Sequence, residues 1–207
     1  MLGRHLGPNP LMPSSSAVTD TSTRILDVAE KLVQTRGFNA FSYANIAAAL
    51  HVTKASLHYH FPTKAKLGEK LIQRYRTGFL AALDGIDPNA AQAGQKLRAY
   101  VGLYSDVLSH NRMCLCGMLA ADYETLPKPM RAELRRFFDA NEAWLTRVIE
   151  CGRERNELAF AGSPVDAARV LVATLEGGML LARSHSDLSR LQSAADHILA
   201  GLGVKPG

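Results

Sequence analysis

The sequence has few cysteines and no long apolar run, and each shortage argues against a class of protein. Three cysteines in 207 residues, an odd number, favour a reducing compartment over a disulfide framework. No apolar run reaches the roughly 18 residues that would indicate a transmembrane helix. Residues 1–22 lack the apolar core of a secretory signal. We therefore expect a cytoplasmic protein with no membrane partner.

The chain also lacks the motifs of common enzymes and metalloproteins. It has no glycine-rich phosphate loop, no Gly-x-Ser-x-Gly nucleophile turn and no Glu-x-x-His pair. His58 and His60 are two residues apart, as are Cys114 and Cys116, and side chains at that spacing diverge on a helix. We expect no catalytic residues, no metal site and no cofactor. The alternative is a small helical enzyme or a cofactor-binding bundle.

Apolar residues recur at intervals of three and four along most of the chain, and no strand pattern stands out. The fold class is therefore predicted to be all-α, with about nine helices. The expected ranges are about 21–36, 43–50, 54–60, 64–83, 91–110, 114–123, 127–156, 164–185 and 187–201. Residues 1–20, rich in proline and serine, are predicted to be a disordered arm.

Residues 42–64 combine two short helical patterns and a tight turn. The first pattern has Ile46, Ala47 and Leu50 on its inner face, and His51 interrupts it. Thr53 can cap the second helix, whose outer face carries polar and aromatic side chains rather than aliphatic ones. This arrangement is typical of a helix-turn-helix that enters the major groove of DNA.

These residues resemble the signature of the TetR/AcrR family of bacterial one-component transcriptional regulators. The resemblance rests on the following positions: Ile25-Leu26, Ala29, Leu32, Gly37-Phe38, Ile46-Ala47, Val52 to Leu57, His60 to Lys64, and Leu67. The chain departs from the family at His51, where glycine is usual, and at His58, where tyrosine is usual. His51 is expected to adopt a left-handed backbone conformation.

The resemblance implies a helix-turn-helix DNA-binding domain over residues 21–68. A helical effector-binding and dimerisation domain is expected to follow over residues 69–207. A homodimer would bind double-stranded DNA at a palindromic operator, as a repressor that a small-molecule effector releases. A non-specific DNA-binding protein is a further alternative.

Positive charge is concentrated near the helix-turn-helix, as DNA contact requires. Residues 1–70 hold eight Lys and Arg against four Asp and Glu, while the remainder holds sixteen against fifteen. Lys54 or His58 is predicted to read bases, and most of the other residues to contact phosphates. Lys64 resembles the phosphate-contacting lysine of the family. The predicted DNA contacts are Ser42, Tyr43, Thr53, Lys54, Ala55, Ser56, His58, Tyr59, His60 and Lys64.

The effector site is predicted only by residue type, as aromatic and methionine surface with a few polar groups. Cys114, near a helix N-terminus and close to Arg112, is expected to have a lowered thiol pKa and to suit a thiol-reactive effector. The alternative for Cys114 is a small apolar residue in a packed helix. The predicted effector residues are Tyr104, Cys114, Met118, Tyr123, Phe137, Trp144, Glu176 and Met179.

Two C-terminal helices are predicted to form the dimer contact, because the helix from residue 164 is apolar on more than one face. The predicted interface residues are Leu171, Leu175, Gly178, Leu188, Leu191 and Ile198. The helix over residues 64–83 is expected to belong to both domains. It would therefore carry movement from the effector site to the DNA-binding helices.

Overall fold

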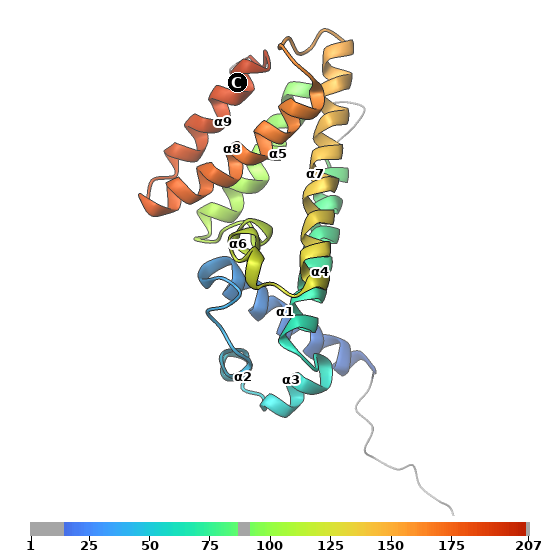
Figure 1. Cartoon of the computed structure of the whole chain (residues 1–207), viewed down its shortest axis with the longest axis vertical. Helices are drawn as coiled ribbons and strands as arrows, with labels where there is room; N and C mark the ends of the chain where they lie inside the picture. The colour runs from blue at the N-terminus through green and yellow to red at the C-terminus, as the bar shows by residue number, and fades with distance from the viewer. Residues whose placement is uncertain (1–14, 87–91, 206–207) are drawn as a thin grey trace, which may run out of the picture.

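The computed structural model describes residues 15–86 and 92–205, and within them the chain is helical with no strand (Figure 1). The first four helices are α1 (Ser15–Arg36), α2 (Tyr43–Leu50), α3 (Lys54–His60) and α4 (Lys64–Asp84). They are followed by α5 (Ala93–Ser109), α6 (Leu115–Ala121), a 3-10 turn (Tyr123–Thr125), α7 (Lys128–Glu154), α8 (Pro164–Ser184) and α9 (Ser189–Gly201). The predicted all-α class and helix order are confirmed.

The first helix begins earlier than expected. We predicted a disordered arm over residues 1–20, but α1 already starts at Ser15. Residues 1–14 lie outside the described part of the chain. Residues 15–20 show no apolar periodicity, so the sequence pattern could not place the start of the helix before residue 21.

Helices α1, α2, α3 and the start of α4 form a small bundle at one end of the molecule (Figure 1). Its core contains Ile25, Ile46 and Leu57, each with no exposed surface. Gly37 ends α1 with a φ of 87°, in the left-handed region that glycine adopts without strain. This bundle fixes the position of α3 at the tip of the chain.

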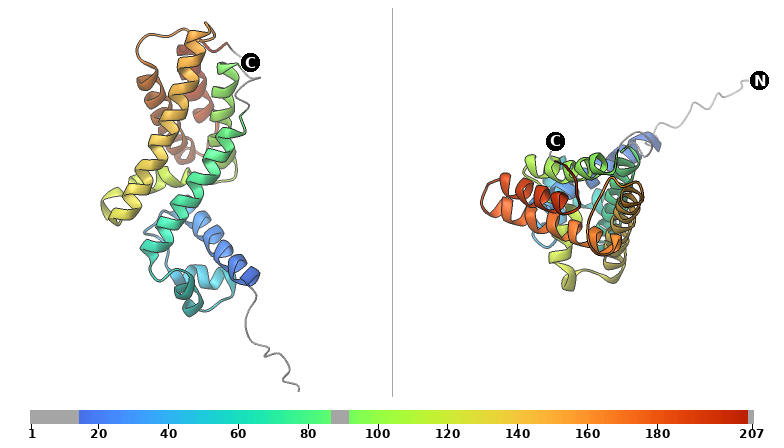
Figure 2. Two further views of the ribbon diagram at one scale, coloured as in Figure 1. Left: turned by 90° about the vertical axis from the view of Figure 1, so that its right-hand side faces the viewer. Right: turned by 90° about the horizontal axis from the view of Figure 1, so that it is seen from above.

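Helix α4 runs without a break from this bundle into the larger one formed by α5 to α9 (Figure 2). Thr63 caps its start by accepting a hydrogen bond from the Lys66 N–H at 3.1 Å. Its buried face then passes from Leu67 and Leu71 in the lower bundle to Leu83 in the upper one. No helix in the described residues is both long enough and apolar enough to cross a membrane.

The two bundles are joined by further polar contacts beside α4. The Phe38 N–H donates to Asp122 Oδ2 at 3.2 Å, and Asn39 Nδ2 donates to Thr125 Oγ1 at 2.8 Å. Arg183, in the last turn of α8, donates to the Thr35 carbonyl at 2.6 Å. The end of α1 is therefore held by α8, and the loop after α1 is held by Asp122 and Thr125, which follow α6.

Candidate nucleic-acid interface and interior sites

The turn between α2 and α3 has the predicted geometry. His51 adopts φ 55° and ψ 42°, in the left-handed region, and the Val52 N–H donates to the Ala47 carbonyl at 3.1 Å. Asn45 Oδ1 accepts from the Ser42 N–H at 2.8 Å at the start of α2. The prediction that His51 adopts a left-handed backbone conformation is confirmed.

Helix α3 lies at the tip of the small bundle (Figure 1). Thr53 Oγ1 accepts from the Ser56 N–H at 3.2 Å, which caps the helix as predicted. Leu57 and Phe61 face the core, with 0% and 5% of their surface exposed. Lys54 and Ala55 are exposed, and Tyr59 has 78% of its surface exposed. A largely exposed aromatic side chain on a polar helix is typical of a binding surface.

Two of the predicted phosphate contacts instead have internal partners. The Tyr43 hydroxyl donates to the Phe61 carbonyl at 2.7 Å, and burial raises its pKa to about 12. Lys64 Nζ donates to the carbonyls of Phe38 and Phe41 at 2.6 and 2.5 Å and lies over both phenyl rings. Burial lowers the pKa of Lys64, and the charge of Asp122 opposes that shift. Both polar groups therefore have partners within the small bundle, and their phosphate contacts stay a prediction.

The histidines of α3 remain on the surface. The His58 ring lies 4.8 Å from the Tyr43 ring, and its Nδ1 is 3.1 Å from the Pro62 carbonyl. Only Nε2 is therefore left for an outside partner. The His60 ring packs edge-on against Tyr59 at 5.2 Å. The other predicted contacts on α3 are thus exposed or partly exposed, and Ser42, which precedes α2, is exposed as well.

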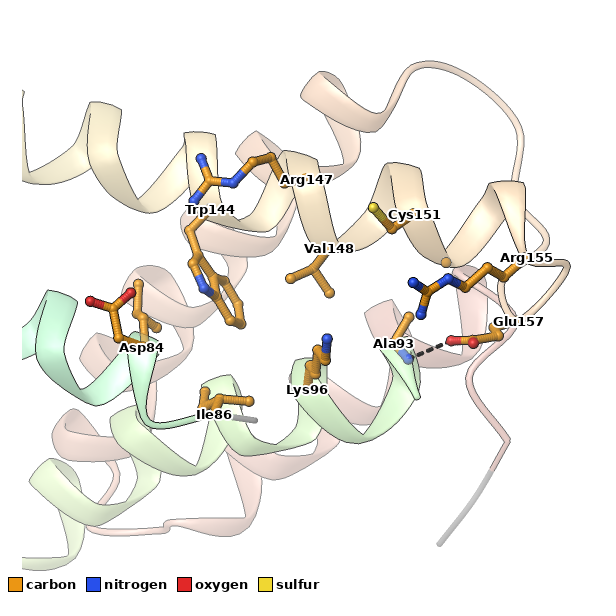
Figure 3. A pocket seen from close by; sticks show the side chains of 12 residues that line it. Asp84, Ile86, Ala93, Lys96, Trp144, Arg147, Val148, Cys151, Arg155 and Glu157 are labelled. Atoms are coloured by element: carbon orange, nitrogen blue, oxygen red, sulfur yellow. Dashed lines mark hydrogen bonds between the residues drawn. The ribbon is translucent and has the colours of Figure 1, made fainter. Parts of the chain in front are cut away.

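The predicted effector residues do not line one pocket. Tyr104, Cys114 and Met179 surround a small cavity of about 10 Å³, close to the volume one water molecule needs. Phe137 is packed in the core with 1% of its surface exposed. Trp144 lines a separate open cavity at the far end of the upper bundle (Figure 3).

Two other predicted effector residues lie near the joint between the bundles. The Tyr123 hydroxyl accepts from Arg135 Nη1 at 2.7 Å, and the Arg131 guanidinium lies over its ring. Met118 lies on α6 beside Gly37, which ends α1. Met118 therefore lies at the contact between α6 and the lower bundle, and Tyr123 contacts α7.

The structure reverses the predicted chemistry of Cys114. The residue precedes α6 as expected, but burial, and then the charge of Glu176, raise its thiol pKa well above the usual value. Burial likewise raises the pKa of Cys116. The nearby Arg112 does not outweigh desolvation, because a thiolate in an apolar interior loses its hydration. Cys151 is exposed and lies in the open cavity beside Trp144.

Glu176 is a partly buried carboxylate on α8 that faces Gly117 of α6. Burial raises its pKa to about 7, and a hydrogen bond with the Cys114 thiol offsets part of that shift. Its Oε1 is buried and has no hydrogen-bond partner among the described residues. A Cβ atom at Gly117 would overlap the carboxylate, so a larger residue on this facing turn of α6 would have to displace the Glu176 side chain.

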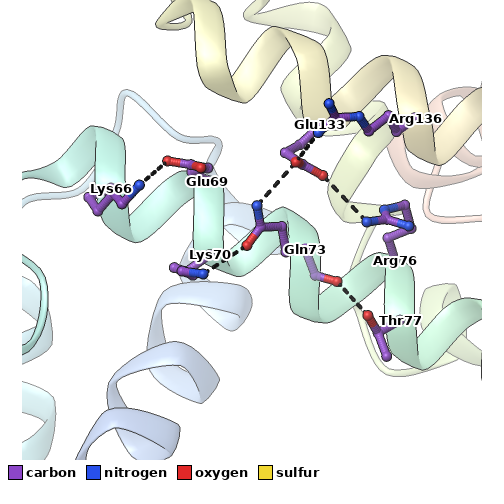
Figure 4. Close-up of polar contacts among 8 residues, drawn as sticks. All are labelled: Lys66, Glu69, Lys70, Gln73, Arg76, Thr77, Glu133 and Arg136. Atoms are coloured by element: carbon purple, nitrogen blue, oxygen red, sulfur yellow. Dashed lines mark hydrogen bonds and ion pairs between the residues drawn. The ribbon is translucent and has the colours of Figure 1, made fainter.

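Sequence reasoning missed a buried carboxylate on α7. Glu133 is 4% exposed and accepts a hydrogen bond from Gln73 Nε2 at 3.1 Å (Figure 4). Arg76 Nη2 lies 3.6 Å from its other oxygen, and Arg136 contacts the first. Burial alone would raise the pKa of Glu133, but the Gln73 hydrogen bond and the two arginines together hold it below its usual value. The available signal was its position, three residues after Met130 in the apolar stripe of α7.

Four of the six predicted dimer residues are buried within one chain, so their assignment is wrong. Leu171 and Leu175 have no exposed surface, and Leu191 has 2%. A Cβ atom on Gly178 would lie 3.0 Å from the Leu191 side chain, which places this glycine between α8 and α9. Leu188 is 52% exposed, and Ile198 is partly buried.

A different face of α8 is unpaired. The exposed large apolar side chains in the described residues are Tyr59 on α3, Leu188, which precedes α9, and Val165, Val170, Leu180 and Leu181 on α8. A groove of about 510 Å³ runs between α8 and α9 past Gly177 and Leu181. A Cβ atom on Gly177 would meet nothing within 4 Å. This apolar face is the part of the upper bundle that a second chain could cover.

Comparison with known proteins agrees with this geometry. The profile described as "Bacterial regulatory proteins, tetR family" matches residues 25–71, and that described as "Tetracyclin repressor-like, C-terminal domain" matches residues 93–198. The chain is 26% identical over 187 residues to the HTH-type transcriptional repressor NemR of Escherichia coli (strain K12), covering 86% of this chain and 92% of that protein.

Solved structures give the same result. A TetR-family transcriptional regulator from Agrobacterium tumefaciens superposes with a TM-score of 0.86 at 31% identity, covering 89% of this chain and 98% of that one. A TetR transcriptional regulator from Legionella pneumophila superposes with a TM-score of 0.76 at 34% identity, covering 88% and 97%.

Proposed function

The chain belongs to the TetR family of bacterial regulatory proteins and is a ligand-responsive DNA-binding transcriptional regulator, and on that premise we propose that it represses transcription from a palindromic operator. The observation that carries the proposal is the exposed polar face of α3 at the tip of the molecule. Regulators of this family are generally not enzymes, and we propose a cytoplasmic site of action, where the operator lies.

The proposed base-reading residues are Lys54 and His58. Lys54 is exposed in the first turn of α3 and has no ion-pair partner among the described residues, so its ammonium is free to meet a guanine edge. His58 offers Nε2, because its Nδ1 faces the Pro62 carbonyl. The remaining proposed contacts are to phosphates, from Ser42, Thr53, Ser56, Tyr59 and His60, with Ala55 against the base edges.

The proposed dimer uses the unpaired face of α8 together with α9. Val170 and Leu181 are 50% and 58% exposed, and Gly177 between them would let a second helix approach closely. Covering this apolar face removes it from water, which favours association. Two copies related by a two-fold axis place two α3 helices on one side of the duplex, which is why the operator is expected to be a palindrome.

The proposed response to an effector passes through α4 and α6. Helix α4 joins the two bundles, and α6 carries Asp122 at its C-terminal end, which accepts from the Phe38 N–H at 3.2 Å. A ligand that separates α6 from α8 would move both connections at once. It needs to prefer the DNA-free state by only a few kcal/mol to empty the operator.

Selection from a random duplex library tests the proposal. We expect the full-length protein to enrich one sequence with two inverted half-sites about one helical turn apart. Fluorescence anisotropy should then show that Lys54→Ala weakens binding and reduces the salt slope by about one, and that His58→Ala changes the preferred base at one position of each half-site. The matched control is Arg147→Ala, which removes an exposed cation of α7 in the upper bundle.

Three results would contradict parts of this assignment. Enrichment of a single, unrepeated half-site would contradict the proposal that a dimer binds the operator. Equal affinity for selected and random duplex would point to a non-specific DNA-binding protein. Uniform losses from both α3 variants would show that His58 contacts phosphate rather than a base.

A further inference from the structure

The open cavity at the far end of the upper bundle has the dimensions of a small-molecule site. It measures about 350 Å³ and lies between the end of α4, the start of α5 and the last turns of α7 (Figure 3). Known ligand pockets have volumes of roughly 300–1,000 Å³. Trp144, Val148 and Ile86 give the cavity an apolar side. Tyr100 stacks on Trp144, with ring centroids 5.8 Å apart and planes 19° apart, which holds the indole in place.

The charged groups around this cavity favour a negative ligand. Lys96 on α5 and Arg155 at the end of α7 approach the space from opposite sides, and Arg147 lies at the rim above Trp144 (Figure 3). Neither the Arg147 nor the Arg155 guanidinium has a hydrogen-bond or ion-pair partner among the described residues.

Two acidic side chains, Glu157 and Asp84, also line the cavity, and they restrict where a negative group can bind. Glu157 Oε2 accepts from the Ala93 N–H at 2.6 Å, so this carboxylate is engaged at the start of α5. Asp84 lies at the other end, beside Trp144 (Figure 3). Asp84 repels an anionic group at its end, whereas at the other end the two cations Lys96 and Arg155 outnumber the Glu157 carboxylate. A ligand that matches this uneven distribution of charge along the cavity carries its negative group at one end only.

We propose that this cavity binds an organic monoanion with an apolar body, which lies on Trp144 and Val148 while its carboxylate or sulfonate contacts Arg155 and Lys96. The arginine guanidinium is charged at any accessible pH and matches a carboxylate with two parallel N–H groups. Leu83 and Asp84, the last residues of α4, also line the cavity, so a bound ligand touches the helix that begins next to α3. That the ligand releases DNA rests on the function proposed above, whereas the binding itself does not.

The chain offers a specific reporter, because Trp144 is its only tryptophan. Full-length protein labelled with 5-fluorotryptophan should give one 19F resonance, which is titrated with 2-naphthoate and with its neutral isostere 2-naphthamide. We expect the acid to shift the resonance and to bind about tenfold or more tightly than the amide, since it gains a charge-assisted contact. Arg155→Gln should lower the affinity for the acid by about tenfold and leave that for the amide unchanged.

Two controls locate the site. Arg153→Gln changes an arginine of the same helix whose guanidinium lies over Phe160 and donates to the Gly162 carbonyl, and it should leave both affinities unchanged. Cys151, the exposed cysteine in the cavity, should react more slowly with iodoacetamide when 2-naphthoate is bound. An unmoved resonance, equal binding of acid and amide, or an unchanged alkylation rate overturns the proposal.

These measurements contain no DNA, so they separate this site from the proposed function. A protein that binds naphthoate in the cavity and fails to select any operator overturns the repressor proposal and supports the anion site. A protein that selects an operator and ignores naphthoate overturns the anion site alone.

Discussion

At the scale of single residues, Glu176 makes stability depend on pH below neutrality. Its pKa is raised from an ordinary value of 4.5 to about 7, mainly by burial. Between these two values the folded chain holds a proton that the unfolded chain has lost. The free energy of unfolding therefore falls as the pH rises through this range, and it levels off above about 7.

Glu176→Gln should remove this dependence. A shift of this size corresponds to about 3 kcal/mol between pH 4.5 and pH 8, so the variant should be more stable than the parent at pH 8 and about equal to it at pH 4.5. Urea unfolding followed by circular dichroism at several pH values measures the effect. A parent protein whose stability is flat from pH 5 to 8 would show that Glu176 is solvated in solution.

Glu133→Gln is the matched control, because the pKa of Glu133 is lowered whereas that of Glu176 is raised. Its contacts with Gln73, Arg76 and Arg136 hold the pKa of Glu133 below the ordinary value. The stability that the carboxylate contributes is present above the unfolded pKa near 4.5 and is lost as the pH falls through the lower folded value. This variant should therefore be less stable than the parent at pH 7, and the difference should fade in acid.

Residues whose roles are local could be predicted from the sequence, and those with tertiary partners could not. His51 and Thr53 act on their own turn and helix end, so spacing and residue type were sufficient. Lys64 and Tyr43 find partners 18 to 26 residues away, at Phe38, Phe41 and Phe61. A helical pattern marks such side chains as accessible, and only the packed structure shows that neighbouring carbonyls already bind them.

At the scale of secondary-structure elements, α8 explains why the dimer residues were misassigned. The helix is apolar on two faces, and periodicity cannot tell which face meets its own bundle. Leu171 and Leu175 pack inside, whereas Val170 and Leu181 point outward. Residue type is ambiguous in the same way, because aromatic side chains of α5 and α7 fill the core as readily as they line a pocket. The predicted effector residues therefore lie in several different places.

Charge on the outer face of α8 should separate the dimer. We expect Leu181→Glu to give a monomer in size-exclusion chromatography with light scattering, because two carboxylates would be buried without partners. The helix content in circular dichroism should not change, since the leucine is 58% exposed in the single chain. Ala99→Glu, on the exposed side of α5, is the control and should remain a dimer. A Leu181→Glu protein that is still dimeric would place the interface elsewhere.

At the scale of the whole molecule, α8 touches each region that a regulator must connect. Its outer face is the proposed dimer surface, and Glu176 and Met179 face the interior. In its last turn Arg183 donates to the carbonyls of Gln34 and Thr35, at the end of α1. An arginine there satisfies carbonyls that the end of a helix leaves without intrahelical partners. Helix α8 therefore links the partner chain, the interior and the DNA-binding bundle, in parallel with α4.

Arg183→Gln should weaken this link without unfolding either bundle. The end of α1 and the loop after it should exchange amide hydrogens faster, while α9 keeps its protection, because only the α1 carbonyls lose a donor. Affinity for the selected operator should fall about three- to tenfold, since the DNA-binding bundle is then less fixed before it binds. Arg190→Gln, which breaks an exposed ion pair with Asp187 on α9, is the control and should leave both measurements unchanged. If hydrogen exchange in α1 did not respond to Arg183→Gln, α4 and α6 alone would hold the lower bundle in place, and α8 would have no direct part in the response to an effector.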